Sequence, residues 1–124
     1  MNKFRITGGK GFHITFPNGV TLSTQFGPGN YGDNYDESFF TEKKDWESNE
    51  AEVAMWVNLP HINNSAWITE EFEDHGDQVI GYCDFEKWLR IFNWCLNYKV
   101  DVEKSTAKAI EAKKKRDEFK AKLI

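Results

Sequence analysis

Two alternating runs near the N-terminus restrict the fold more than any other part of the chain. Apolar and polar residues alternate from Phe12 to Phe16, and the alternation resumes from Val20 to Thr24. Such a period of two is typical of strands with one buried face. A three-residue loop at Pro17-Asn18-Gly19 places Phe16 opposite Val20 and keeps both apolar sets on the same face. The pattern therefore predicts a β-hairpin that turns at these three residues.

Shorter stretches predict the rest of a sheet. A strand is expected at 3–7, a second hairpin at 53–57 and 66–69, and a further short strand at 78–82. Residues 58–65 contain Pro60 and three Asn, which favours a long loop inside the second hairpin. Between the two hairpins, the polar residues 34–49 predict an irregular excursion.

A helix is predicted from Asp84, whose side chain is well suited to the N-cap position. Apolar residues then recur at intervals of three and four, which places them on one face. We expect this face to be buried against the sheet, and it comprises Phe85, Trp88, Leu89, Phe92, Cys95 and Leu96. Neither Gly nor Pro occurs from Asp84 to Ile124, so the sequence leaves open whether the helix continues unbroken.

These elements predict an α+β fold, in which an antiparallel sheet of four to five strands is packed by a C-terminal helix and followed by a basic helical extension. Residues 1–98 are expected to form the α+β domain and residues 99–124 the basic tail, which has nine Lys or Arg against five Asp or Glu. The chain has 124 residues, of which 40% are hydrophobic and 15% aromatic, so it can bury a core of its own.

Cys83 and Cys95 are the only cysteines, and they do not form a CxxC pair. Two isolated thiols among apolar residues are typical of reduced cysteines that pack inside a cytosolic protein. No apolar run approaches the length of about 18 residues that a membrane span needs, and the first ten residues lack the hydrophobic stretch of a signal peptide. The sequence therefore predicts a cytoplasmic protein with no membrane partner.

Acidic residues are concentrated in the middle of the chain, where fifteen Asp or Glu between Asp33 and Glu86 face two Lys, a local balance of −13. Such a surface attracts a partner with a basic surface and repels nucleic acid, which only the basic tail is expected to contact. The predicted partner-binding residues are Glu70, Glu71, Glu73, Asp74 and Asp77, with Trp56 as an exposed anchor. A surface that serves only solubility, and a core position for Trp56, are the alternatives.

A glycine-rich loop follows the first hairpin. It could hold a nucleotide, because backbone N–H groups near glycine approach phosphates closely and tyrosines stack on bases. Its candidate ligand-binding residues are Gly27, Gly29, Asn30, Tyr31, Asp33 and Tyr35. The loop matches neither GxxxxGK[ST] nor GxGxxG, contains no Lys or Arg, and carries carboxylates that repel phosphate. A structural turn is the alternative interpretation.

No pattern in the sequence specifies catalysis, a metal or a cofactor. His13 lies near Thr15 and Ser23 on the polar face of the hairpin, but a flat sheet face offers neither an oriented base nor an oxyanion site. The acidic and histidine residues at 73–77 match no metal-binding spacing. We therefore predict a protein that is not an enzyme and uses no cofactor.

The segment GFHITFPNGV at 11–20 and its continuation QFGPGNY at 25–31 resemble small uncharacterised proteins of bacteriophages and prophages. No activity comes with this resemblance. It implies a small protein of the host-cell cytoplasm that binds and inhibits a host protein, such as a defence or nucleic-acid-processing protein. A binder that sequesters a nucleotide signal through residues 27–35 is the alternative, and a virion component is the third. The partner's identity and the oligomeric state are not encoded in any motif.

Overall fold

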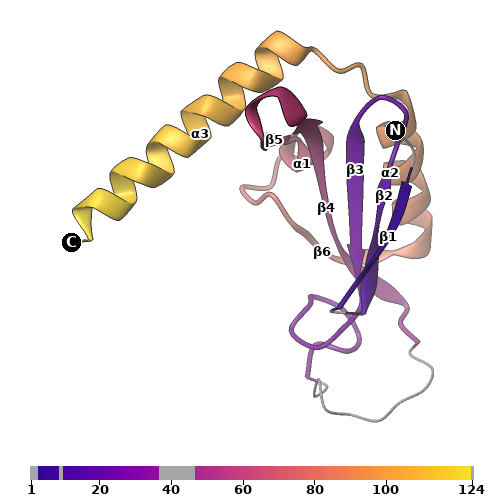
Figure 1. The fold of residues 1–124 in the computed structure, drawn as a ribbon. Coiled ribbons are helices and arrows are strands. Elements are labelled where there is room, and N and C mark those ends of the chain that lie inside the picture. Colours follow the sequence, from indigo (N-terminus) through magenta and orange to yellow (C-terminus); the bar gives the residue numbers. More distant parts are fainter. Residues whose placement is uncertain (1–2, 9, 37–46, 124) are drawn as a thin grey trace.

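The structure is a computed structural model that describes residues 3–8, 10–36 and 47–123. Its strands are β1 (Lys3–Thr7), β2 (Gly11–Thr15), β3 (Val20–Gln25), β4 (Glu50–Leu59), β5 (Asn64–Trp67) and β6 (Ile80–Asp84). Its helices are the 3-10 turn η1 (Pro60–Ile62), α1 (Thr69–Phe72), α2 (Phe85–Asn97) and α3 (Val102–Lys122). Figure 1 shows how these elements are arranged.

The described strands form one antiparallel sheet in the order β1-β2-β3-β4-β5, with β6 paired to the first part of β4. The sheet is packed by helix α2, so the predicted α+β class is confirmed. It has six strands rather than four or five, because both of the short outer segments, β1 and β6, join it. None of the described helices has the length and apolar character needed to cross a bilayer.

The first hairpin has the predicted register. Ile14 lies opposite Leu22, and the main-chain N–H of Phe16 donates to the oxygen of Val20 at 2.8 Å. Gly19 has a φ of +88°, a left-handed conformation that glycine adopts without steric cost. Because Phe16 and Val20 are both buried, the three-residue loop keeps the two apolar sets together.

The second hairpin is longer than predicted, because β4 and β5 leave only residues 60–63 between them. Asn58 remains in the strand because its side chain donates to Gly19 O at 2.8 Å and to Thr21 Oγ1 at 2.7 Å. Asn63 has a φ of +49° and closes the turn. Of the predicted excursion at 34–49, residues 37–46 lie outside the described part of the chain.

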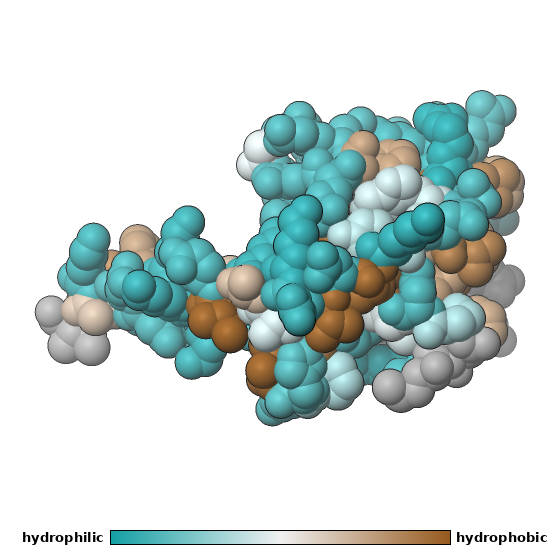
Figure 2. All heavy atoms as spheres, turned by 90° about the horizontal axis from the view of Figure 1, so that it is seen from above, coloured by the Kyte–Doolittle hydropathy of each residue, from teal (hydrophilic) through white to brown (hydrophobic). Residues whose placement is uncertain are grey.

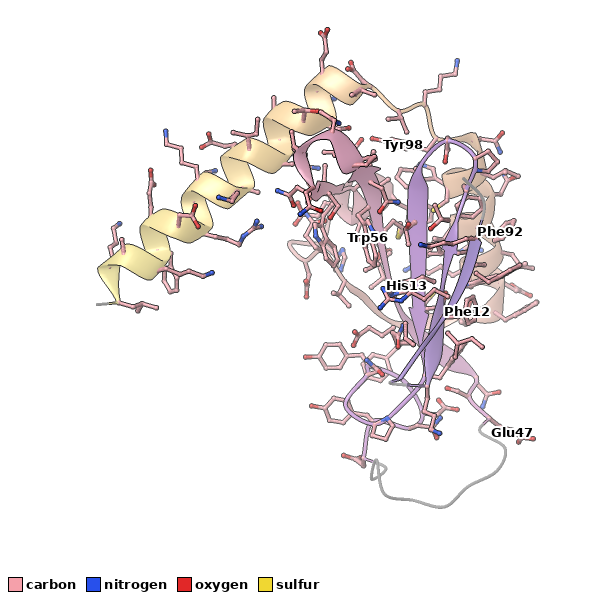
Figure 3. The ribbon with its side chains drawn as sticks, viewed as in Figure 1. Phe12, His13, Glu47, Trp56, Phe92 and Tyr98 are labelled. Atoms are coloured by element: carbon pink, nitrogen blue, oxygen red, sulfur yellow. The ribbon has the colours of Figure 1, made fainter. Side chains whose placement is uncertain are left out.

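The sheet has two different faces. On the inner face, Leu22 lies opposite Met55, and both side chains are fully buried. Figure 3 shows Phe92 of α2 on this side, whereas His13 and Trp56 point to the opposite side. We call that second side the open face. It carries polar and aromatic side chains instead of the aliphatic core.

Helix α2 packs on the inner face through part of the predicted set. Cys95 is buried, and Trp88 and Phe92 pack against the core as predicted. Ile91 and Cys95 are fully buried, but Phe85, Leu89 and Leu96 are 68%, 47% and 48% exposed, so that part of the prediction is wrong. At about 100° per residue, these three positions lie well to one side of the line through Ile91 and Cys95. Apolar residues extend farther around this helix than the sheet can cover.

The predicted helical region forms two separate helices. Asp84 caps α2 by accepting a hydrogen bond from Lys87 N at 2.8 Å, and α2 ends at Asn97. The extended link 98–101 leads into α3, whose first part packs on β5 and β4. The rest of α3 projects from the body, and Figure 2 shows it as a mostly hydrophilic arm.

Candidate functional site

The glycine-rich loop is held by hydrogen bonds of its own backbone. The N–H groups of Gly29, Asn30 and Tyr35 donate to carbonyl oxygens within residues 27–35, over distances of 3.0, 3.1 and 3.2 Å. Tyr31 N–H donates to a carboxylate oxygen of Glu52 at 2.9 Å. These four donors are therefore already used by the protein, which leaves them unavailable to a phosphate.

The loop instead presents two of its tyrosines beside a third from strand β6. The rings of Tyr31 and Tyr35 are stacked, with centroids 5.6 Å apart and planes 7° from parallel. The ring of Tyr82 lies 6.0 Å from that of Tyr31. The three side chains are 45%, 44% and 57% exposed, respectively for Tyr31, Tyr35 and Tyr82. We call this group the tyrosine platform.

Two backbone features hold the platform together. Tyr82 N–H donates to Tyr31 O at 2.9 Å, and Tyr82 has a left-handed φ of +51°, which is unfavourable for a residue with a bulky side chain. A Cβ atom at Gly81 would lie only 2.9 Å from the Cβ of Tyr31, so glycine is required for the loop to approach β6 this closely. The unfavourable backbone conformation of Tyr82 thus accompanies an exposed position of its ring beside Tyr31.

Two carboxylates lie close to the platform tyrosines in the sequence. Asp33 lies within the loop, and its Oδ2 accepts hydrogen bonds from Asn49 N at 2.9 Å and Asn49 Nδ2 at 3.1 Å. Asp36 follows Tyr35 and is exposed. No Lys or Arg occurs among the described residues from 11 to 86. Aromatic rings in an acidic environment are suited to bind cations rather than phosphates.

Part of the predicted acidic patch is neutralised within the molecule. Glu73 pairs with Lys87 at 2.7 Å, and this hydrogen bond lowers the pKa of the Glu73 carboxyl. Glu71 lies 3.5 Å from Lys108 and accepts a hydrogen bond from the Tyr98 hydroxyl at 2.9 Å. Burial and this bond raise the pKa of Tyr98 to about 12. Glu71 and Glu73 therefore join α1 and the following loop to helices α2 and α3.

The other acidic residues of the patch differ in this respect. Among the described residues, Glu70, Asp74 and Asp77 form no salt bridge with Lys or Arg. Asp74 and Asp77 are exposed, and Asp77 Oδ1 accepts a hydrogen bond from Val79 N at 3.2 Å. These three carboxylates are the part of the predicted patch that is available to a partner.

Trp56 lies on the open face and is half-buried, so it is not a core residue. Its ring is 5.1 Å from that of His13 and 5.0 Å from that of Trp67, which is 38% exposed. Burial, together with the nearby charge of Arg5, lowers the pKa of His13. Trp56 thus belongs to an aromatic row across strands β2, β4 and β5, and its ring contacts are with His13 and Trp67.

Sequence reasoning missed Tyr82, Glu52 and Trp67. Gly81 inside an expected strand was the available signal for Tyr82, since an isolated glycine in a strand often marks a bulge or a close approach of the backbone. The structure has a register shift on β4 between Ala51 and Val53, opposite this part of β6. Nothing in the sequence links Tyr82 to a loop some fifty residues earlier.

A cavity of about 160 Å³ lies near the start of α2 and is lined mainly by apolar residues, among them Phe12, Cys83 and Trp88. This volume is below the range of about 300–1,000 Å³ that is usual for ligand pockets. Burial raises the pKa of the Cys83 thiol to about 11, which keeps it protonated. In the described part of the chain, no three His, Cys, Asp or Glu residues lie close enough to hold a metal ion.

In comparisons with known proteins, no protein-family model, curated protein or solved structure matches the chain.

Proposed function

We propose that the chain is a non-enzymatic binding protein that inhibits a host protein by covering a basic surface on it. The tyrosine platform is the observation that carries the proposal. Tyrosine is enriched in protein interfaces because its ring provides a large contact area at a low cost in conformational entropy. Tyr31, Tyr35 and Tyr82 are exposed, yet their rings are held in contact with one another.

The chemistry of the platform favours arginine and lysine side chains of the partner. A guanidinium group can lie over a phenol ring and also donate to a neighbouring carboxylate, such as that of Asp36. The exposed carboxylates of Asp74 and Asp77 add long-range attraction, which increases the rate of association with a basic surface.

Inhibition follows from the kind of surface that would be covered. Proteins that process nucleic acid bind it through basic grooves, and an acidic protein seated in such a groove excludes the nucleic acid. The resemblance of residues 11–31 to phage and prophage proteins supports a target in the bacterial host, in its defence or nucleic-acid-processing machinery. One inhibitor molecule would be consumed for each molecule of target.

The proposal is tested by capture of the partner and assay of its activity. The immobilised chain is incubated with bacterial lysate at low and high salt, beside a Tyr31→Ser/Tyr82→Ser variant and a Glu103→Gln/Glu111→Gln control on α3. We expect a protein with a basic surface to bind the chain and the control, to dissociate at high salt, and to be lost from the tyrosine variant. The purified partner should lose activity at a one-to-one ratio.

Two outcomes would contradict the proposal. One is a captured protein that binds the tyrosine variant as well as the unmodified chain. The other is a captured protein whose activity is unchanged when it is saturated with the chain. Circular dichroism of both variants checks that the exposed substitutions leave the fold intact.

A further inference from the structure

The sheet has an open edge at β1. Among the described strands, β1 pairs only with β2, and it lies at the end of the strand order opposite β5. Figure 1 shows it at the margin of the sheet. An edge strand presents backbone N–H and C=O groups that can pair with an additional strand.

The edge also exposes two large apolar side chains. Phe4 and Ile6 are 81% and 89% exposed. They lie opposite Ile14 and Phe12, which places them on the inner face, as a continuation of its apolar rows. Phe12 contacts Trp88 of α2, with ring centroids 6.4 Å apart. The exposure of Phe4 and Ile6 shows that the cover provided by α2 does not extend to β1.

The alternate residues of β1 carry positive charge. Lys3 and Arg5 lie opposite Thr15 and His13, so their side chains belong to the open face, and both residues are exposed. The charge of Arg5 also contributes to the lowered pKa of His13. Strand β1 therefore offers an apolar surface on one face of the sheet and a basic surface on the other.

We propose that β1 binds an extended segment of a partner protein as a seventh strand, and that apolar side chains alternate with Asp or Glu in this segment. Its apolar side chains cover Phe4 and Ile6, while its carboxylates pair with Lys3 and Arg5 across the strands. This surface is separate from the tyrosine platform and has the opposite charge preference, so the inference does not depend on the proposed function.

A second copy of the chain fits this edge less well. Two β1 strands that pair antiparallel over their full length place Lys3 opposite Thr7, and Arg5 opposite Arg5 of the other copy. Like charges directly opposite each other destabilise a strand pair. A strand with acidic side chains at these positions removes this repulsion, because its carboxylates can pair with both Lys3 and Arg5.

Two fluorescently labelled nine-residue peptides test the inference, one alternating Val with Glu and the other alternating Val with Lys. We expect the Glu peptide to bind the full chain saturably and the Lys peptide to bind at least about tenfold more weakly. Arg5→Glu should remove this preference, because the new carboxylate offsets the charge of Lys3 on the same face of β1. Ile6→Ser should weaken binding of the Glu peptide about tenfold, whereas Ile110→Ser, the same change at another exposed position, on α3, should have no effect.

Further controls separate strand addition from charge attraction. A Glu peptide that is N-methylated at every backbone amide should not bind, because it has no donor left for the ladder. A Lys113→Gln/Lys114→Gln/Lys115→Gln variant of α3 should bind the unmodified peptide normally, as should Tyr31→Ser/Tyr82→Ser. In NMR spectra, peptide binding should slow amide exchange at residues 3–7.

Several results would overturn the inference. They are absence of binding at up to about 1 mM peptide, equal affinity for both peptides, and loss of binding in the Lys113–Lys115 variant. A dimer in sedimentation that Ile6→Ser abolishes would show that a second copy occupies the edge, and this would also overturn it.

Discussion

Asn18, in the turn of the first hairpin, donates a hydrogen bond from Nδ2 to the main-chain oxygen of Cys95 at 2.8 Å. The same group donates to Tyr98 O at 3.0 Å, and Asn18 Oδ1 accepts from Val20 N at 3.1 Å. The last carbonyl groups of a helix have no partner within the helix. A turn residue 77 positions earlier in the chain thus satisfies the end of α2.

Replacement of Asn18 should therefore weaken the whole domain. We expect Asn18→Ala to lower the free energy of unfolding by about 1–3 kcal/mol, because the carbonyl groups of Cys95 and Tyr98 both lose the bond from Asn18. Cys95 O then keeps only the longer bond from Tyr98 N, at 3.3 Å. Asn18→Asp, which keeps the acceptor for Val20 N but has no donor, should be destabilised as well. Urea unfolding followed by tryptophan fluorescence measures both. Unchanged stability of the two variants would show that the bonds contribute nothing net.

The second prediction concerns the stability of variants on the buried and exposed faces of α2. Ile91→Ala should cost about 2–5 kcal/mol, since Ile91 is fully buried against the sheet. Leu89→Ala should cost less than about 1 kcal/mol, because Leu89 is 47% exposed. Denaturant titration of the two variants compares them directly. Equal losses would mean that α2 is rotated relative to the described packing.

The tyrosine platform can be disturbed without touching a tyrosine. Gly81→Ala places a Cβ atom 2.9 Å from Tyr31 Cβ and should push the loop away from β6. We expect binding of the captured partner to weaken at least tenfold while the domain stays folded. Gly8→Ala is the matched control, because no atom lies within 4 Å of its added methyl group. Equal binding by both variants would contradict a role for the platform.

The Glu73–Lys87 pair predicts a pH dependence of stability. The hydrogen bond from Lys87 lowers the pKa of Glu73 from its ordinary value of 4.5 in the folded state. The folded state therefore favours the ionised form of Glu73 more than the unfolded state does, so the pair stabilises the fold at pH values above the ordinary pKa. This contribution is lost as the pH falls through the lower, folded pKa. Glu73→Gln should flatten the acid limb of stability against pH, measured by thermal unfolding from about pH 2 to 6.

Both thiols should be unreactive in the native protein. Burial raises the pKa of Cys83 to about 11 and that of Cys95 to about 12, so neither forms appreciable thiolate at pH 8. We expect iodoacetamide to modify them only after unfolding in urea, as followed by mass spectrometry. Rapid labelling of the folded chain would show that one of these residues is accessible.

Local patterns account for the parts of the fold that the sequence predicts correctly. The register of the first hairpin depends on alternation and on a Pro-Asn-Gly turn, and the start of α2 depends on Asp84, all of which act over a few residues. The buried face of α2 was predicted only in part, because apolar residues cover much of the helix. Trp88, Phe92 and Cys95 pack on the core as predicted, whereas Phe85, Leu89 and Leu96 are exposed. The choice between Ile91 and Leu89 is made by the sheet, which the helix sequence does not describe.

The site shows the same division. Tyr31 and Tyr35 could be singled out from their loop. Their proximity to Tyr82 depends on a bulge where β6 pairs with β4 and on the left-handed φ of Tyr82 itself, which a sequence pattern would predict only for glycine. The acidic segment was recognisable as a cluster of charge. Only the folded chain distinguishes Glu71 and Glu73, which pair with Lys108 and Lys87, from Asp74 and Asp77, which form no salt bridge with any Lys or Arg that the structure describes.

The arm formed by α3 separates positive charge from the negatively charged body of the molecule. Thirteen residues beyond Ala109 extend the helix by about 20 Å, and this part includes four consecutive cationic residues at 113–116. The body at the other end carries the excess of carboxylates. A molecule with such a dipole moment experiences a torque in the field of a charged target and turns before contact, so its association rate should be much more sensitive to ionic strength than its dissociation rate.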